Sequence, residues 1–250
     1  MASSNTAAAT PPLDIAIVGG GIIGVMTALG LHHRGIKATI YERAPTWHEV
    51  SAGFAFTAPG RSYMQQLHPG IVEVLGQISQ KTDAATSNSY WDAFHPRSRA
   101  DASDEATALL FRTPNNKLDF WGCVRSQLLL GMAALLPEGS VVFGKQLAGY
   151  EEAEHKVVLR FDDGTTVQAD ALLGCDGIHS ATRKGLLGAD HPASEPGYTH
   201  IVAYRTMVPI EVGVAALGDK VAQSGCMHCG PDACLMSYPV RIQFPQIQIR

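Results

Sequence analysis

One stretch near the start of the chain limits the possible folds more than any other. The run 13–43 reads as a strand, a tight turn, a helix and a second strand. Residues 14–18 form a short apolar run rich in β-branched side chains, which is typical of a strand buried on both faces of a parallel sheet. Apolar residues then recur at helical spacing over 22–29, and a second strand is expected at 38–41.

The turn in this stretch carries the spacing G-x-G-x-x-G at Gly19, Gly21 and Gly24. Gly19 permits a sharp turn, Gly21 lets the backbone approach a pyrophosphate, and Gly24 lets the helix pack close to the sheet. The helix N-terminus also presents N–H groups and a positive dipole end to phosphates. A glycine-rich turn without a ligand is the alternative, but the strands and the helix fall in register with the motif and favour a dinucleotide site.

Glu42 stands at the end of the second strand, where it is placed to accept hydrogen bonds from a pair of ribose hydroxyls. Its charge would repel a 2′-phosphate. We therefore expect FAD or NAD, and not NADP, as the resident nucleotide.

Charge and composition limit the partners and the cellular setting that we expect for this chain. The net charge of −4 over 250 residues, without a run of like charges, gives no reason to expect a nucleic-acid partner. No apolar run approaches membrane-spanning length, so no membrane partner is expected either. Residues 1–12 lack the features of a signal peptide and are interpreted as a flexible leader. The five scattered cysteines do not suggest a disulfide framework and favour a reducing, cytoplasmic setting.

Cys226 and Cys229 form a C-x-x-C with His228 inside it and Cys234 just beyond. A zinc or redox site is one interpretation of this cluster. No second ligand pair follows at metal spacing and no thioredoxin-like unit surrounds it, so we expect no metal.

Two further segments contain candidate ligand residues. The small-residue stretch 51–60 includes Gly53 and suits a backbone that passes close to a flat ring, although its spacing alone favours a glycine-bearing strand and turn. Arg125 is the lone cation of a predicted helix within 118–136. It either contacts an anionic ligand or extends to the surface at the helix start.

The second half of the chain begins with short strands over 141–169, which predict an antiparallel meander. An apolar strand then ends at Asp176 and Gly177, and a helix is expected from about Ser180. An aspartate at the carboxyl end of a strand lies where doubly wound sheets bind ligands. The remainder, 191–250, is predicted to consist mainly of strands.

In combination these motifs resemble the single-component flavin-dependent aromatic hydroxylases, particularly the salicylate hydroxylase-like monooxygenases of fungal polyketide pathways. The resemblance spans 13–241. It implies FAD as cofactor, NADH or NADPH as reductant, molecular oxygen as co-substrate and a small phenolic or aromatic-acid substrate.

The same resemblance assigns roles to residues. Glu42 would bind the adenosine ribose, Arg125 would contact the cofactor near its ribose or phosphates, and Gly53 would lie beside the ring system. Asp176 and Gly177 match a second fingerprint linked to both FAD and NAD(P)H use, which Arg183 closes.

Two catalytic candidates also come from the resemblance. Arg205 falls where an arginine stabilises the substrate phenolate, and Tyr238 falls where a tyrosine orients the substrate ring. The alternatives are a strand arginine in a surface ion pair and a core tyrosine with a satisfied hydroxyl.

A third fingerprint of such enzymes, a Gly-Asp followed by proline and glycines, is missing from the sequence, which closes with an Ile- and Gln-rich run over 242–250. We therefore expect a C-terminally truncated or alternatively spliced product that binds FAD weakly. An inactive fragment, or another flavoenzyme of the same fold such as an epoxidase or halogenase, stays open.

The predicted fold class is α/β. A discontinuous Rossmann-like FAD-binding domain is expected from 13–80 and 117–188, containing the strand–helix–strand unit and the meander. A β-rich substrate domain, incomplete at its C-terminus, is expected from 81–116 and 189–250.

Overall fold

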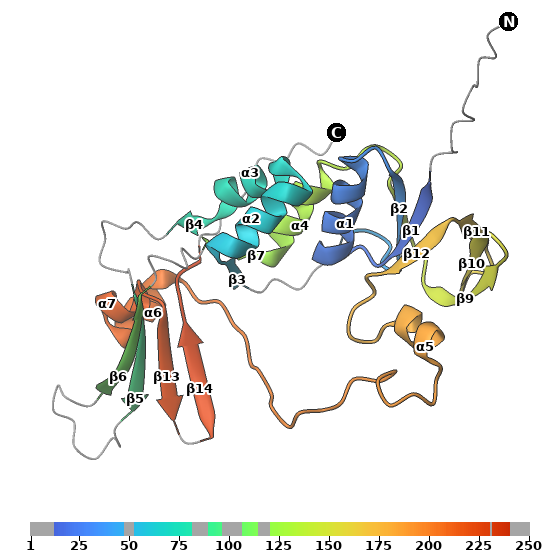
Figure 1. Cartoon of the computed structure of the whole chain (residues 1–250). Coiled ribbons are helices and arrows are strands. Elements are labelled where there is room, and N and C mark those ends of the chain that lie inside the picture. Colours follow the sequence, from blue (N-terminus) through green and yellow to red (C-terminus); the bar gives the residue numbers. More distant parts are fainter. Residues whose placement is uncertain are drawn as a thin grey trace, which may run out of the picture. The chain divides into compact units, whose positions relative to one another are not determined.

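The computed structural model describes residues 13–47, 53–81, 90–96, 107–114, 121–230 and 232–240. The chain divides into two compact units, and Figure 1 labels their helices and strands. The first unit combines 1–48 with 133–201, and the second combines 49–132 with 202–250. The predicted leader 1–12 lies outside the described residues.

The first unit is built on a four-stranded parallel sheet with the order β12-β1-β2-β8. Its strands are β1 (Asp14–Val18), β2 (Lys37–Glu42), β8 (Val141–Phe143) and β12 (Ala171–Gly174). The helix α1 (Ile22–His32) connects β1 to β2, so the predicted strand–helix–strand unit is confirmed. Because the strands are parallel, their carboxyl ends share one edge of the sheet, which is where open α/β sheets bind ligands.

The meander predicted over 141–169 is confirmed for 147–169, whereas 141–143 forms β8 of the parallel sheet. It consists of β9 (Leu147–Ala153), β10 (Lys156–Phe161) and β11 (Thr166–Ala169), paired in the antiparallel order β11-β10-β9. Its apolar residues share a core cluster with the parallel sheet: Leu159 is fully buried, and the rings of Tyr41 and Phe161 lie 5.1 Å apart. A short helix, α5 (Ala181–Leu187), follows β12.

The second unit contains a small antiparallel sheet with the order β3-β7-β4 and three helices. These elements are β3 (Gly53–Phe56), β4 (Gln80–Lys81), β7 (Trp121–Val124), α2 (Ala58–Leu67), α3 (Pro69–Ile78) and α4 (Arg125–Ala133). Pro69 occupies the first turn of α3, where its missing N–H is not needed by the helix, and it separates α2 from α3.

A second sheet in this unit has the order β14-β13-β5-β6. Its strands are β5 (Tyr90–Pro96), β6 (Thr107–Pro114), β13 (Cys226–Gly230) and β14 (Ala233–Ser237). The helices α6 (Ile210–Leu217) and α7 (Asp219–Ala222) precede β13 in the chain.

The prediction that 191–250 consists mainly of strands is wrong for 191–222, where no strand forms. Residues 201–209 form neither helix nor strand, and 210–222 is largely helical. Although Val and Ile favour strands, α6 has strong helix boundary signals, with Pro209 at the N-cap, Glu211 in the first turn and Gly218 at the C-cap with a φ of 80°. These local signals outweigh the β-propensity of the run.

The compact units differ from the predicted domain boundaries. The prediction placed 53–80 and 121–132 with the parallel sheet, but β3, β7, α2 and α3 pack with one another in the second unit. Residues 189–201 belong instead to the first unit. The functional division into a FAD-binding and a substrate domain stays a prediction.

Within the described residues, no helix is both long and apolar enough to cross a membrane.

Candidate functional site

The turn after β1 requires glycine at two positions. Gly19 has a φ of 105°, and its N–H donates to the Tyr41 carbonyl over 2.9 Å. A Cβ at Gly19 would lie 2.4 Å from the carbonyl oxygen of Cys175, and one at Gly24 would lie 1.9 Å from the carbonyl oxygen of Gly19. The sharp turn and the close approach of the helix that the motif predicts are therefore both present.

Glu42 lies against this turn. Its Oε2 accepts a hydrogen bond of 2.5 Å from the N–H of Gly20, and its Oε1 accepts one of 2.8 Å from Ala44. A Cβ at Gly20 would approach the Cβ of Glu42 to 3.0 Å, so Gly20 is the glycine that admits this side chain. Sequence reasoning missed this role, and its only signal was a glycine at the variable position between Gly19 and Gly21.

The fit of this edge to a dinucleotide follows from the groups that it presents. The helix α1 begins after Gly21 with no side-chain cap and no acidic residue in its first turn. Its first N–H groups therefore keep their capacity for an anion. Each carboxylate oxygen of Glu42 accepts one hydrogen bond here and has lone pairs for another donor, such as a ribose hydroxyl.

The second predicted motif meets the first at the same edge of the sheet. A Cβ at Gly19 would lie 3.0 Å from the Cα of Asp176, which follows β12. The Oδ1 of Asp176 accepts from the Ser180 hydroxyl at 2.5 Å, and its Oδ2 accepts from the Thr182 N–H at 3.0 Å and from the Thr182 hydroxyl at 3.1 Å. The carboxylate thus holds the start of α5. Sequence reasoning did not identify its contact with Thr182.

The electrostatics of Asp176 follow from these contacts. Partial burial acts to raise the pKa of its carboxyl, but the hydrogen bonds from Ser180 and Thr182 outweigh burial and leave the pKa below its ordinary value. Asp176 is therefore ionised at neutral pH.

Gly177 and Arg183 shape the loop that follows. Gly177 has a φ of 79°, a conformation that favours glycine. The Nη2 of Arg183 donates to the Ile178 carbonyl at 2.6 Å, and its Nε donates to the Ser194 carbonyl at 3.2 Å. Arg183 thus joins the two arms of the loop around α5, a structural role compatible with its predicted place at the end of the fingerprint.

Three predicted residues are neighbours in the second unit. Gly53 lies opposite Val124 in the pairing of β3 with β7, and Arg125 follows Val124 as the first residue of α4. The Tyr238 hydroxyl donates to the Gly53 carbonyl at 3.0 Å. A Cβ at Gly53 would lie 3.2 Å from a methyl group of Val240, so the glycine accommodates this packing.

The role of Arg205 toward the substrate stays a prediction. Arg205 is exposed and lies in 201–209, outside any helix or strand. A buried cation of the second unit is instead Arg61, which is 8% exposed, lies 4.3 Å from the ring centre of Trp121 and donates to the Phe56 carbonyl at 2.9 Å. Sequence reasoning missed Arg61 because its stacking partner is distant in the sequence.

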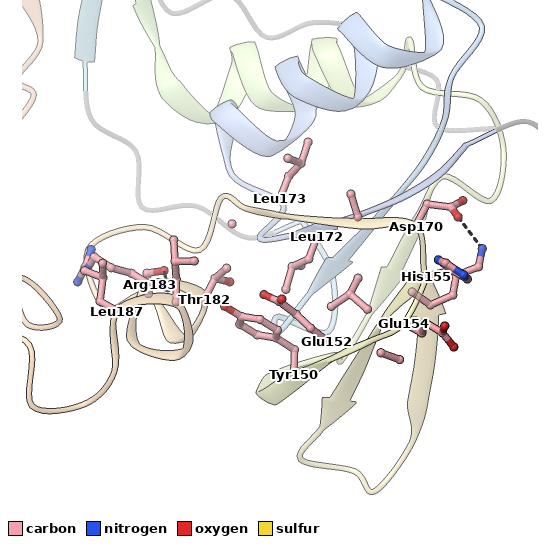
Figure 2. Close-up of a pocket in the computed structure, with 17 residues that line it drawn as sticks. Tyr150, Glu152, Glu154, His155, Asp170, Leu172, Leu173, Thr182, Arg183 and Leu187 are labelled. Carbon is pink, nitrogen blue, oxygen red and sulfur yellow. Dashed lines mark hydrogen bonds and ion pairs between the residues drawn. The ribbon is translucent and has the colours of Figure 1, made fainter.

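A pocket of about 700 Å³ lies in the first unit between the meander, β12 and α5. Figure 2 shows Tyr150, Leu172 and Thr182 among its lining residues, with Asp170 at one side. Lys156 and Asp170 form an ion pair of 2.7 Å on its wall. The glycines of the β1 turn do not line this pocket, whereas Thr182 and Arg183 of the second motif do.

The chain is similar to known flavoproteins. A family model described as FAD binding domain matches residues 12–204. A FAD-dependent monooxygenase of Aspergillus terreus is 49% identical over 237 residues, which cover 94% of this chain and 54% of the relative. The salicylate hydroxylase asL1 of Sarocladium schorii is 40% identical over 239 residues, which cover 92% of this chain and 48% of the relative.

A solved structure, a salicylate hydroxylase substrate complex, superposes with a TM-score of 0.73 at 26% identity and covers 95% of this chain and 59% of that chain. The chain spans about half the length of the curated relatives that it matches. The family match covers most of the chain and includes both motifs at the edge of the parallel sheet. The chain therefore belongs to the FAD binding domain family.

Proposed function

We propose that this chain holds FAD at the carboxyl edge of its parallel sheet and acts in a monooxygenase that hydroxylates a phenolic or aromatic-acid substrate, with NADH or NADPH as reductant. The observation that carries the proposal is the meeting of three predicted elements at one edge, namely the turn at Gly19, the Glu42 carboxylate and the loop at Asp176. Binding sites of doubly wound sheets lie at such an edge.

The first unit contributes groups for the adenosine half of the cofactor. The oxygens of Glu42 would accept hydrogen bonds from the ribose hydroxyls, and the N–H groups at the start of α1 would face the pyrophosphate. Both sets of groups are fixed by backbone contacts before any ligand binds. The ordering cost of binding is therefore small at these positions.

The second unit holds the other residues that we assign to the cofactor and to the substrate. Arg125, at the start of α4, would donate to the ribose or phosphates, and the backbone at Gly53 would pass beside the ring system. The hydroxyl of Tyr238 is engaged by the Gly53 carbonyl, so Tyr238 would act through its ring face rather than as a proton donor.

Bound FAD supplies the redox chemistry by which electrons from NAD(P)H activate oxygen for transfer to an electron-rich ring carbon. The chain would exclude water and favour the ionised form of a phenolic substrate. Arg205 stays the candidate for the cation that stabilises the ionised phenolic substrate. Because Arg205 is exposed, this role would require another part of the protein to cover residues 201–209.

The relatives support the reaction class. Proteins named FAD-dependent monooxygenase and salicylate hydroxylase are 49% and 40% identical to this chain. The superposed salicylate hydroxylase contains a bound substrate. These relatives favour a small aromatic acid or phenol as the substrate class, and the fungal sources of both proteins fit a role in secondary metabolism.

The proposal is tested by supplying the purified chain with FAD, NADH or NADPH, ¹⁸O₂ and a panel of phenolic acids. We expect one ¹⁸O atom in a hydroxylated product, detected by mass spectrometry, and oxidation of NAD(P)H that depends on the phenolic acid. Oxidation of NAD(P)H that only reduces oxygen to hydrogen peroxide, without hydroxylated product from any phenolic acid and with saturating FAD bound, would contradict the proposed hydroxylase activity.

A further inference from the structure

The hairpin of β13 and β14 brings two cysteines face to face. In their antiparallel register Cys229 lies directly opposite Cys234, and Gly230 opposite Ala233 closes the hairpin. Directly opposed residues of antiparallel strands have Cα atoms about 4.5–5.5 Å apart. That separation falls within the range of about 4.4–6.8 Å that a disulfide bond spans.

The same register excludes the pair suggested by the C-x-x-C spacing. Cys226 and Cys229 are three residues apart on β13, so their side chains point to opposite faces and their Cα atoms are about 10 Å apart. Two cysteines at that separation do not form a disulfide bond without backbone movement. Cys226 is buried and lies opposite Ser237 instead.

Both opposed thiols are free, and one of them is open to reagents. Cys234 is exposed and lies on β14, the edge strand of its sheet, and Cys229 is half-buried beside it. Figure 1 shows β13 and β14 side by side as the hairpin of this sheet. Partial removal from water is the main cause that raises the pKa of the Cys234 thiol, and the neighbouring Cys229 thiol raises it further. Because the thiolate is the attacking species, thiol–disulfide exchange at Cys234 accelerates as the pH rises.

The geometry points to Cys229 and Cys234 as a reversible dithiol–disulfide site that is oxidised by small-molecule disulfides. The thiolate of Cys234 attacks a sulfur of oxidised glutathione and releases one glutathione thiolate. The thiolate of Cys229 then attacks the Cys234 sulfur of the mixed disulfide and releases the second. Two protein thiols lose two protons and two electrons, and one glutathione disulfide becomes two glutathione molecules.

The test equilibrates the reduced 250-residue chain with oxidised glutathione at mildly alkaline pH. The remaining thiols are then alkylated under denaturing conditions. Of the five thiols, two are consumed, so three should be alkylated. Proteolysis on the N-terminal side of Asp232 separates Cys229 from Cys234, and only a disulfide bond then keeps both in one species. We expect this species in mass spectra, with the alkyl label on Cys226.

Single variants provide the controls. Cys229→Ser or Cys234→Ser should abolish the linked species and leave a glutathione adduct on the remaining cysteine of the pair, whereas Cys175→Ser should retain the link. Far-ultraviolet circular dichroism verifies that each variant is folded. A link that contains Cys226, or only glutathione adducts and intermolecular dimers in the folded wild-type chain, would overturn the inference.

Discussion

At the scale of single residues, two carboxylates define the candidate nucleotide site. Glu42 accepts from the N–H groups of Gly20 and Ala44, and Asp176 accepts from the N–H of Thr182. The sequence predicts both acids because each follows a strand at a recognisable position. It does not predict Gly20 or Thr182, since these contacts depend on how the turn and α5 fold back onto the acids.

Asp176 gives a pH-dependent prediction. Burial acts to raise the pKa of its carboxyl, but hydrogen bonds lower this pKa below the ordinary value of 3.8. The ionised carboxylate therefore stabilises the fold above pH 3.8, and this stabilisation is lost as the pH falls through the lower pKa of the folded state. Asp176→Asn should therefore reduce the free energy of unfolding near neutral pH, by about 1–2 kcal/mol. The difference from wild type should shrink below pH 3.8.

Urea unfolding at several pH values measures this difference. The exposed Asp190→Asn is the matched control and should leave the unfolding free energy within about 0.5 kcal/mol of wild type. An Asp176→Asn effect that is equally large at neutral pH and in acid would mean that the ionised carboxylate is not what stabilises the loop.

Tyr238 gives a second residue-scale prediction. Tyr238→Phe removes the hydrogen bond to the Gly53 carbonyl but keeps the ring, so the free energy of unfolding should fall by about 0.5–1.5 kcal/mol. Tyr63, which is 69% exposed, supplies the control variant Tyr63→Phe. Equal stability of the two variants in urea unfolding would show that the Tyr238 hydroxyl contributes nothing to holding Gly53.

At the scale of elements, prediction succeeded where the local pattern and the tertiary environment agree. The β1–α1–β2 unit and the meander are predicted because their apolar periodicities match the faces that they bury. The helix α6 was missed because strand-forming residues were weighed above its boundary signals at Pro209 and Gly218. The opposed cysteines of β13 and β14 could not be foreseen, since their register depends on the hairpin.

The approach of α1 to its turn gives the element-scale prediction. In Gly24→Ala the new methyl group would lie 1.9 Å from the Gly19 carbonyl oxygen, so α1 must move away from the turn that follows β1. We expect a loss of about 1–3 kcal/mol in unfolding free energy.

Gly213→Ala, within α6, is the matched helical control. Its Cβ would meet only Ala222 at 3.7 Å, an ordinary contact, so the substitution should stabilise the chain by up to about 1 kcal/mol. Thermal or urea unfolding compares the two variants. Similar stability changes in both would refute the view that Gly24 is required by close packing.

At the scale of the whole molecule, the sequence predicts the fold class and the nucleotide motifs, but not the compact units. The first segment of the first unit ends at His48, and β3 belongs to the second unit because it pairs with β7, 65 or more residues later in the chain. Such long-range pairing leaves no local signal. The family match agrees with the motif-based prediction, and its range of 12–204 includes the glycines and acids on which that prediction depends.

The most direct test of this account is a titration of the purified chain with FAD, followed by flavin fluorescence, for wild type, Glu42→Ala and the exposed control Glu138→Ala. We predict saturable one-to-one binding by wild type and Glu138→Ala. Loss of charge-assisted hydrogen bonds should weaken binding by Glu42→Ala by about 1–3 kcal/mol, or about 5- to 150-fold in dissociation constant. Equal affinity of folded Glu42→Ala and wild type, or no saturable binding by wild type, would contradict the assignment of the FAD site to this edge of the sheet.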